Sequence, residues 1–335
     1  MYVLGIESSC DETAAAVVTE GRKILANVVY SQLEEHEPFG GVVPEVAARA
    51  HLDKIRPVVE KALTEAGLDV SEITAVAGVC GPGLIGGVIV GATFAKSIAM
   101  ARNIPFIAVN HLEAHAISVR LTEDVQFPYL LLLASGGHCQ LCVVNGIDHF
   151  EVLGKTIDDS VGESFDKVAK LLGLGYPGGP LLEKRASRGD DRRFSLPTPL
   201  CSGESCDFSF SGLKTAVLAA SRKCFGEEDR TDLCASFQRT VITVLARKLN
   251  LALDICGKRN IGITCVAVAG GVAANEAIRR ELRSVCASRG LRLSAPPAFL
   301  CTDNGAMVAW MGAEKLLAGQ TSELNFPPRP RWPMG

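Results

Sequence analysis

One pattern of strands and turns occurs twice in this sequence, and it restricts the fold more than any other feature. Apolar runs separated by polar turns lie at 2–9, 14–19 and 23–30, and again at 129–134, 139–144 and 149–154. In the second set, Asn145-Gly146 is a strong signal for a two-residue hairpin. Such a duplication predicts an α/β fold of two similar lobes with a central cleft between them.

Further elements complete both halves. The sequence predicts helices over 44–67, 88–102, 160–172, 232–255, 276–288 and 302–317, and strands over 74–79, 104–110, 265–269 and 291–294. We expect an interruption of the first helix at Pro57, because proline removes a donor and clashes with the preceding turn. Residues 173–180 are predicted to form an ordered loop or hinge, and residues 183–207 a polar surface excursion.

The order of these elements gives the expected domain boundaries. At 335 residues the chain is long for a single core, so two domains are the natural expectation. We expect an N-terminal lobe over 1–127 that is joined by the last helix at 303–325, and a C-terminal lobe over 128–302. The Pro/Arg-rich tail over 326–335 cannot form regular helix or sheet and is either mobile or a docking strip.

The overall charge limits the kinds of partner that the chain can bind by itself. A net charge of −3 gives no global basic field, so contact with a nucleic acid would need a local basic surface or another subunit. The local candidates are Arg192-Arg193, Arg279-Arg280-Arg283 and Arg329-Arg331. An ordinary solvated surface is the alternative for each of them.

Cysteine usage and the apolar segments favour a cytoplasmic protein. The chain enters a strand directly after Met1, without a basic region or cleavage site, and many of its 12 cysteines lie in apolar runs typical of reduced thiols. Cys139 and Cys142 point to opposite faces of one predicted strand, which disfavours a metal or redox pair. The uncharged run at 73–95 is interrupted by Gly81-Pro82-Gly83, so we predict no membrane span.

Two of the six histidines, His111 and His115, form a candidate metal site. Four residues apart, they share one face of a helix that follows the strand at 104–110, at the sheet edge where α/β folds place ligands. A surface helix with two unremarkable histidines is the alternative. Asp303 is an attractive third ligand, although spacing alone does not select it among 37 acidic residues. Two imidazoles and a carboxylate suit Fe(II) or Zn(II).

The glutamate between the histidines argues against a zinc-protease arrangement. Those enzymes use H-E-x-x-H, in which the glutamate adjoins the first histidine. Glu113 is two residues from each histidine, about 200° around the helix from both. It would point away from the metal and could not activate a water molecule there, so the spacing disfavours a hydrolytic peptidase.

Three glycine-rich turns share one chemical property. Gly81–Gly87, Ser135–Gly137 and Gly270–Gly271 each follow a predicted strand and lack bulky side chains, so their backbone N–H groups can face an anion. Together they favour a nucleotide or another phosphate ester as the ligand. None of them matches the P-loop or the Rossmann fingerprint.

Several of these segments also occur, in the same order, in one known family. The shared motifs are Gly5-Ile-Glu-Ser-Ser-Cys-Asp-Glu-Thr13, Gly40-Gly-Val-Val-Pro-Glu45, Gly81-Pro-Gly-Leu84, Asn110-His-Leu-Glu-Ala-His115, Ser135-Gly-Gly-His138, Asp158-Asp159, Tyr176-Pro-Gly-Gly-Pro180, Phe208-Ser-Phe-Ser-Gly-Leu-Lys214 and Gly270-Gly-Val-Ala-Ala-Asn275. From its first strand to its last helix, the chain resembles the TsaD family of bacterial tRNA N6-adenosine threonylcarbamoyltransferases, formerly called glycoproteases or O-sialoglycoprotein endopeptidases.

This resemblance implies an ASKHA fold, the duplicated fold of actin-like ATPases and RNase H. It implies transfer of the threonylcarbamoyl group from threonylcarbamoyl-AMP to the N6 amine of the adenosine after the anticodon, in tRNAs that read codons beginning with A. The implied metal ligands are His111, His115 and Asp303, usually with iron and sometimes zinc. The implied substrate-binding residues are Leu133, Ala134, Ser135, Gly136, Gly137, Asp166, Gly179, Asn275 and, with less weight, Glu183. The implied protein partners are TsaB-like and TsaE-like subunits.

Three other functions remain as alternatives. A metal-dependent glycoprotein endopeptidase would agree with the old family label, but the position of Glu113 speaks against it. A kinase or ATPase of the same fold would use a catalytic aspartate and would not need the histidine pair. A non-catalytic TsaB-like scaffold would lack the histidine motif. The sequence offers no evident nucleophile, so we expect no covalent enzyme intermediate.

Overall fold

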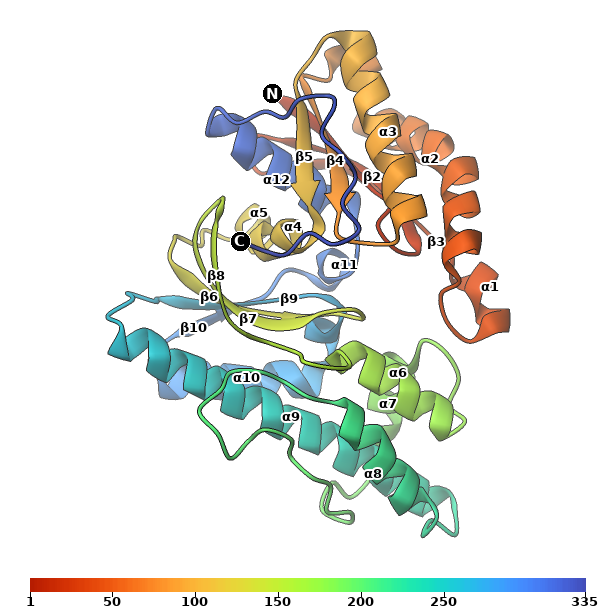
Figure 1. Cartoon of the computed structure of the whole chain (residues 1–335), viewed down its shortest axis with the longest axis vertical. Helices are drawn as coiled ribbons and strands as arrows, with labels where there is room; N and C mark the ends of the chain where they lie inside the picture. The colour runs from red at the N-terminus through yellow and green to blue at the C-terminus, as the bar shows by residue number, and fades with distance from the viewer. The chain divides into compact units, whose positions relative to one another are not determined.

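Each half of the chain builds one five-stranded mixed sheet (Figure 1). The computed structural model describes residues 1–335. The chain divides into unit 1, Met1–Asp124 with Thr302–Gly335, and unit 2, Val125–Cys301. The C-terminal segment thus belongs to the same unit as the N-terminus, although all of unit 2 separates them in the sequence.

The two sheets share one topology. The sheet of unit 1 has the order β3-β2-β1-β4-β5, and that of unit 2 has the order β8-β7-β6-β9-β10 when read in the same direction. In unit 1 the strands are β1 (Tyr2–Glu7), β2 (Glu12–Thr19), β3 (Ile24–Ser31), β4 (Ala75–Gly81) and β5 (Phe106–Asn110). In unit 2 they are β6 (Tyr129–Ala134), β7 (Cys139–Gly146), β8 (His149–Lys155), β9 (Cys265–Ala269) and β10 (Arg292–Ser294).

Strand directions repeat as well. In each unit three consecutive strands pair antiparallel, and the first of them pairs parallel with the next strand of the sheet. A parallel neighbour needs a crossover connection, which helices supply in both units. The duplicated α/β architecture predicted from the sequence is therefore confirmed.

Helices cover both faces of the first sheet. They are α1 (Leu33–His36), α2 (Pro44–Ala66), α3 (Ile85–Arg102), α4 (His111–Ile117), α5 (Val119–Thr122) and α12 (Gly305–Leu317), with short 3-10 turns η1 (Glu37–Phe39) and η2 (Val70–Glu72). Leu4 and Ile6 of β1 face the core shared with α2 and α3, whereas Gly5 between them faces α12. A Cβ atom on Gly5 would lie 2.3 Å from the Ala309 nitrogen, so α12 can approach β1 only because residue 5 is glycine.

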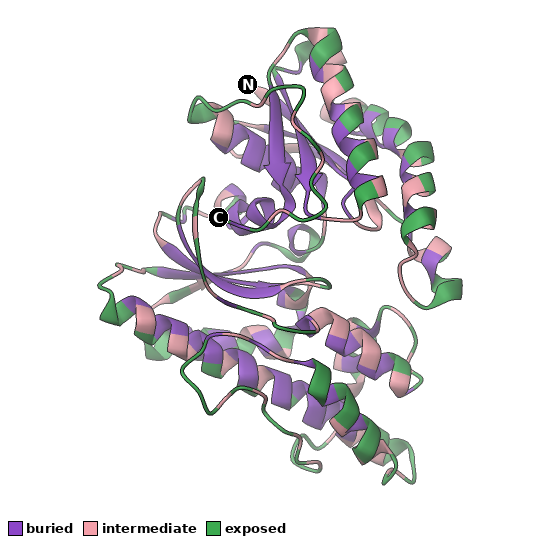
Figure 2. Cartoon of the chain, in the orientation of Figure 1, coloured by how far each residue is buried: buried purple, intermediate pink, exposed green.

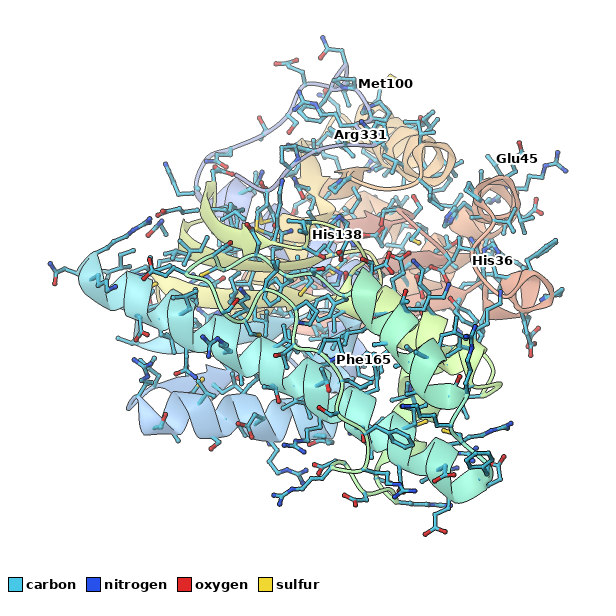
Figure 3. The ribbon with its side chains drawn as sticks, turned by 60° about the horizontal axis from the view of Figure 1, so that its bottom comes forward. His36, Glu45, Met100, His138, Phe165 and Arg331 are labelled. Atoms are coloured by element: carbon cyan, nitrogen blue, oxygen red, sulfur yellow. The ribbon has the colours of Figure 1, made fainter.

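The second unit is organised around one long helix. Its helices are α6 (Val161–Leu171), α7 (Gly178–Ala186), α8 (Ser211–Ser221), α9 (Glu227–Lys258), α10 (Glu276–Ser288) and α11 (Ala298–Cys301), with the 3-10 turn η3 (Gly271–Ala274). Along α9 a buried stripe alternates with exposed residues, as Figure 2 shows. The ring of Phe165, labelled in Figure 3, packs edge-on against Phe237 of this stripe at 5.1 Å between centroids.

Some sequence-based boundaries were wrong. Helix α2 continues through Pro57, whose ring is exposed, while the buried residues Ile55, Val58 and Val59 hold the helix against the sheet. The helical turn α11 at Ala298–Cys301 was not predicted. The last helix ends at Leu317, as its apolar pattern predicted, and does not reach residue 325, the bound used for the N-terminal lobe. In unit 2, α7 begins inside the predicted loop at 173–180, α8 was not predicted, and α9 begins at Glu227 rather than Asp232.

The tail after residue 325 forms no helix or strand but is docked on unit 1. The Arg329 N–H donates to the Cys80 carbonyl at 2.7 Å, and the Gly83 N–H donates to the Pro330 carbonyl at 3.2 Å. The Arg329 guanidinium also lies over the rings of Phe326 and Trp332. Of the two states expected for the tail, the structure shows the docked one.

Helix α3 is the one helix whose length and composition would allow it to cross a membrane. Its buried residues, which include Ala92, Ala95 and Ala99, belong to the core of unit 1. Core helices of soluble proteins meet the same criterion, so this feature is weak evidence for a membrane span.

Candidate metal centre and anion-binding loops

The histidine helix α4 begins at the end of β5 and is fixed there by Asn110. The Asn110 Oδ1 atom caps the helix by accepting from the Leu112 N–H at 2.9 Å and the Glu113 N–H at 3.4 Å. Its Nδ2 group donates to the carbonyls of Trp332 and Pro333, each at 3.2 Å. The start of α4 is therefore held from both sides, by its own cap and by the docked tail.

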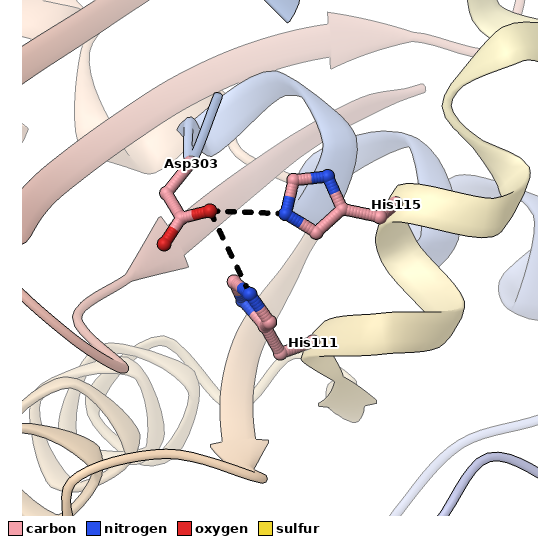
Figure 4. Close-up of side chains that lie close together, drawn as sticks. All are labelled: His111, His115 and Asp303. Carbon is pink, nitrogen blue, oxygen red and sulfur yellow. Dashed lines mark hydrogen bonds and ion pairs between the residues drawn. The ribbon is translucent and has the colours of Figure 1, made fainter. Parts of the chain in front are cut away.

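The side chains of His111, His115 and Asp303 converge (Figure 4). The Asp303 Oδ1 atom lies 3.0 Å from His115 Nε2 and 3.6 Å from His111 Nε2. The two rings are 4.7 Å apart and nearly perpendicular, and one ligand atom from each of the three residues lies within 4.8 Å of the other two. Both histidines are buried, while Asp303 is partly exposed, which leaves one side of the group accessible.

Asp303 reaches this group because α12 begins immediately after it. The Asn304 side chain caps α12 by accepting from the Met307 N–H at 3.0 Å, so the chain turns into the helix just past Asp303. The Gly305 Cα packs against β2, where an added Cβ would lie 2.5 Å from the Ala15 carbonyl carbon. Close packing of α12 on the sheet thus fixes the position of the carboxylate.

A second carboxylate lies behind His111. Glu7, at the end of β1, has its Oε2 atom 2.9 Å from His111 Nδ1, and its Oε1 atom accepts from the Ser9 N–H at 2.5 Å. Burial alone would lower the pKa of His111, but the negative charges of Asp303 and Glu7 outweigh it and raise this pKa to about 9. The group therefore attracts positive charge.

The neighbouring loop adds further acidic groups. Burial, followed by the charges of Asp303 and Asp11, raises the pKa of Glu12 well above its usual value. Burial also raises the pKa of the Cys10 thiol, with a further contribution from Asp11. Carboxylates crowded in this way hold protons unless a cation neutralises them, so the charge pattern fits a metal ion.

Glu113 takes no part in this group. Its Oε2 atom lies 4.0 Å from the Lys315 ammonium on α12, with which it forms an ion pair. Glu113 thus lies on the side of the helix away from the two imidazoles, as the spacing predicted. Its negative charge is balanced by Lys315.

In unit 2 the Ser135–Gly137 turn presents an open backbone. The Ser135 N–H donates to the His138 carbonyl at 2.8 Å, and the His138 N–H donates to the Ser135 Oγ at 3.1 Å, which closes the turn. Gly136 and Gly137 are exposed, and a Cβ on either would meet open space. Ser160, which caps α6, donates its hydroxyl to the Gly136 carbonyl and ties the turn to that helix.

Asp166, Glu183 and Asn275 make hydrogen bonds within unit 2. Asp166 Oδ1 accepts from the Gly178 N–H at 2.8 Å, and Glu183 Oε1 accepts from the Glu276 N–H at 2.8 Å. Asn275 caps α10 through the Ile278 N–H, and its Nδ2 group donates to Gln238 Oε1 at 3.0 Å. These bonds fix the beginnings of α7 and α10 relative to α6 and α9.

The other predicted binding residues lie on adjoining elements of unit 2. Leu133 and Ala134 are the buried last residues of β6, directly before the open turn, and Gly179 is the second residue of α7. The sequence did not point to Gln238 or Ser160, because each acts through a partner that is 37 or 24 residues away. Neither Gln238 nor Ser160 belongs to a sequence motif from which its role could have been predicted.

The first glycine turn differs from its prediction. The Gly83 N–H donates to Pro330, and the Leu84 N–H donates to the Ser9 carbonyl at 2.7 Å. A Cβ on Gly81 would lie 1.8 Å from the Arg329 carbonyl oxygen. These glycines therefore admit the tail and the β1–β2 loop, and the two amides are not available to an anion.

Part of the predicted basic surface has internal partners. The Arg279 guanidinium donates to the Ala273 and Pro296 carbonyls, which holds the turn before α10 in place. Arg193 pairs with Asp229 at 3.4 Å. Arg331, labelled on the docked tail in Figure 3, is exposed, as are Arg280 and Arg283 on α10.

Comparison with known proteins gives consistent results. The family model described as TsaD, tRNA N6-adenosine threonylcarbamoyltransferase, matches residues 23–310. A curated protein of that name from Rhodospirillum rubrum is 56% identical, with 99% of this chain and 94% of that protein covered. Another, from Paramagnetospirillum magneticum, is 53% identical, with 100% and 97% covered.

Two solved structures share the fold at low sequence identity. HypF from T. kodakarensis is 18% identical, with a TM-score of 0.63 over 95% of this chain and 48% of that chain. Component A of (R)-2-hydroxyglutaryl-CoA dehydratase from Acidaminococcus fermentans is 17% identical, with a TM-score of 0.57 over 95% and 99%. These likenesses concern the fold alone, and they confirm the ASKHA prediction.

Proposed function

The chain belongs to the TsaD family of tRNA N6-adenosine threonylcarbamoyltransferases, and we propose that it carries out that family's reaction. It would transfer the threonylcarbamoyl group from threonylcarbamoyl-AMP to the N6 amine of the adenosine at position 37, next to the anticodon, and release AMP. The substrates would be tRNAs that read codons beginning with A. The observation that carries this proposal is the convergence of His111, His115 and Asp303 in a chain matched over almost its full length.

The donor set supports one divalent metal ion per subunit. Two imidazole nitrogens and one carboxylate oxygen suit Fe²⁺, which we favour, or Zn²⁺. The accessible side of Asp303 leaves room for further ligands, and the surrounding carboxylates favour a cation. When bound, the metal supplies Lewis acidity toward a carbonyl or phosphate oxygen.

The residues of the chain would act mainly by positioning. The exposed backbone of Gly136 and Gly137 offers N–H groups to a phosphate, as in other glycine-lined anion sites. Holding the acyl donor and the adenosine amine in line gains the entropic advantage of an intramolecular reaction. We propose direct transfer, without a covalent enzyme intermediate.

The binding surface for the adenylate would lie on unit 2. Asp166 of α6 accepts from the first residue of α7, and Glu183 of α7 accepts from the first residue of α10, so these helices meet there. We assign substrate binding to Leu133, Ala134, Ser135, Gly136, Gly137, Asp166, Gly179, Asn275 and Glu183. Glu183 has the weakest support, because its Oε1 atom already accepts the Glu276 N–H.

Partners and location follow from the reaction. The proposed substrate is a tRNA, and the chain would act with TsaB-like and TsaE-like subunits in the cytoplasm. Twelve free cysteines agree with a reducing compartment. Exposed Arg280, Arg283 and Arg331 are basic groups that an RNA backbone could contact.

The alternative functions have less support. A peptidase would need a general base beside the metal, and the candidate Glu113 is engaged with Lys315 instead. A kinase of this fold would have no use for the buried histidine pair. Incubation with glycoprotein substrates and analysis for cleavage tests the peptidase directly.

The proposed reaction can be tested with nucleosides. Purified protein, TsaB-like and TsaE-like partners, threonine, bicarbonate, ATP and unmodified tRNA should yield threonylcarbamoyladenosine, detected by mass analysis of the digested tRNA. His111→Ala should lose both bound metal and product, because it removes one of three ligands. His149→Ala, an exposed histidine on β8, is the matched control and should keep both. Full product from a metal-free His111→Ala protein would contradict the metal assignment.

A further inference from the structure

Glu7 is a buried carboxylate that has no lysine or arginine partner. It is 0% exposed, yet its two oxygens meet only the His111 ring and the backbone N–H of Ser9. A buried carboxylate lowers stability unless hydrogen bonds satisfy it. Its presence at the end of β1 therefore calls for a function, and no step described above uses it.

We propose that Glu7 is a positioning residue that orients His111 for metal binding, an inference that rests on the proposed metal centre. An imidazole binds a metal through the nitrogen that carries no proton, and the partner of the other nitrogen decides which one that is. In the neutral ring that a metal ion requires, Glu7 accepts from His111 Nδ1, so the lone pair is on Nε2. Nε2 is the nitrogen that lies 3.6 Å from Asp303 Oδ1.

The structure holds this carboxylate in place from two directions. The ends of β1 and β5 lie at the same edge of the sheet, because β4 pairs parallel with both strands. Ser9 binds Glu7 through its N–H and also places its Oγ 3.1 Å from His111 Nδ1. The Ser9 carbonyl is in turn bound by the Leu84 N–H at the start of α3.

The two histidines differ in this respect. The Nδ1 atom of His115 is buried and has no hydrogen-bond partner, so nothing equivalent to Glu7 orients its ring. Instead the His115 Nε2 atom lies at 3.0 Å from Asp303. Glu7 therefore contacts only one imidazole of the pair, that of His111, and favours the tautomer of this ring that is protonated at Nδ1.

An amide cannot replace the carboxylate at this position. Glu7 accepts two hydrogen bonds, one on each oxygen, whereas glutamine offers one oxygen and one NH₂ group. In Glu7→Gln, the NH₂ group would face either the Ser9 N–H or His111 Nδ1. In the first arrangement the NH₂ group and the Ser9 N–H are two donors that face each other. In the second the NH₂ group donates to His111 Nδ1, so the imidazole proton moves to Nε2, the nitrogen that should bind the metal.

The test compares metal affinities of two glutamate-to-glutamine variants. Zn²⁺ binding is measured in competition with a chromophoric chelator for wild-type protein, Glu7→Gln and Glu113→Gln. Glu113 is the matched control, a buried glutamate on α4 itself that pairs with Lys315. Loss of a carboxylate behind a ligating histidine typically weakens binding by about 10–100-fold. We expect this loss of Zn²⁺ affinity in Glu7→Gln and not in Glu113→Gln. A loss below tenfold in Glu7→Gln overturns the proposal, and so does an equal loss in Glu113→Gln.

Two further measurements keep the result unambiguous. Melting of the metal-free proteins shows whether Glu7→Gln is folded. The wild-type protein loaded with Zn²⁺ and carrying ¹⁵N-labelled histidine needs no variant: its spectrum should show His111 protonated at Nδ1, and metal on Nδ1 overturns the proposal. A wild-type protein that binds no Zn²⁺ or Fe²⁺ overturns the metal centre as well, whereas equal affinities of wild type and Glu7→Gln overturn only the assignment of Glu7.

Discussion

Asp158 shows how single residues make this fold depend on pH. It accepts hydrogen bonds from the Ser209 and Ser211 hydroxyls and from the Phe210 N–H at 2.8 Å, and so secures the chain entering α8. The slight desolvation of this largely exposed side chain would raise the pKa of Asp158, but these hydrogen bonds outweigh it and hold this pKa below its ordinary value. A depressed folded pKa means that the stabilisation is present above about pH 4 and is lost as pH falls through the folded pKa.

We therefore expect Asp158→Asn to lower the free energy of unfolding by about 1 kcal/mol at pH 7, a modest loss because the side chain is exposed. Below about pH 4 the difference from wild type should shrink, since the wild-type carboxyl then becomes protonated as well. Urea unfolding at several pH values measures both effects. Glu204→Gln, an exposed carboxylate of the same unit, is the control, and an equal loss there would refute the role of Asp158.

At the level of residues, sequence reasoning predicted local relations and missed distant ones. The shared face of His111 and His115 followed from their spacing in a helix. The choice of Asp303 required resemblance to a family, because 188 residues separate it from His115. Glu7 lies in one of the motifs shared with the family, but nothing in the sequence showed that it faces a histidine 104 residues away.

At the level of elements, the packing of α12 on β1 determines where Asp303 lies. Gly5→Ala would place a Cβ 2.3 Å from the Ala309 nitrogen and 2.5 Å from the Gly305 carbonyl oxygen. Backbone atoms cannot move aside as a flexible side chain can, so the helix must shift. We expect a loss of about 2–4 kcal/mol in the free energy of unfolding, together with weaker metal binding.

Chemical unfolding and chelator competition test this expectation. Gly21→Ala is the matched control, because its nearest neighbour would be a side-chain oxygen at 3.8 Å, and it should change neither quantity appreciably. A Gly5→Ala protein as stable as wild type would show that α12 adjusts without cost.

The docked tail is a second element that supports the histidine helix. Removal of residues 329–335 would take away the acceptors of Gly83 and Asn110 and the donor to Cys80. We expect a loss of about 1–3 kcal/mol in stability, since water replaces these bonds only in part. Thermal melting measures it. Arg331→Ala, which leaves the backbone contacts intact, should change stability by less than about 0.5 kcal/mol, and equal stability of the shortened chain would show that the tail is dispensable.

At the level of the whole molecule, the sequence predicted the architecture better than its details. The repeated strand order could be inferred because buried strands and polar turns alternate in both halves. Helix α8 was missed because it follows a long polar stretch, and α2 continues past Pro57 because its buried face packs on the sheet. Tertiary contacts of this kind override local preferences, and a single sequence does not show them.

The divided composition of unit 1 has a consequence for how the protein is made. The ribosome delivers residues 1–124 first, but the helix that covers one face of their sheet arrives only after residue 301. At roughly 5–20 residues per second, synthesis of the intervening unit takes about 10–35 s. During that time unit 2, a continuous segment, can fold, while the first sheet waits with an uncovered apolar face. A chaperone has its longest opportunity to bind there, and the proposed metal centre can be complete only once translation has passed Asp303.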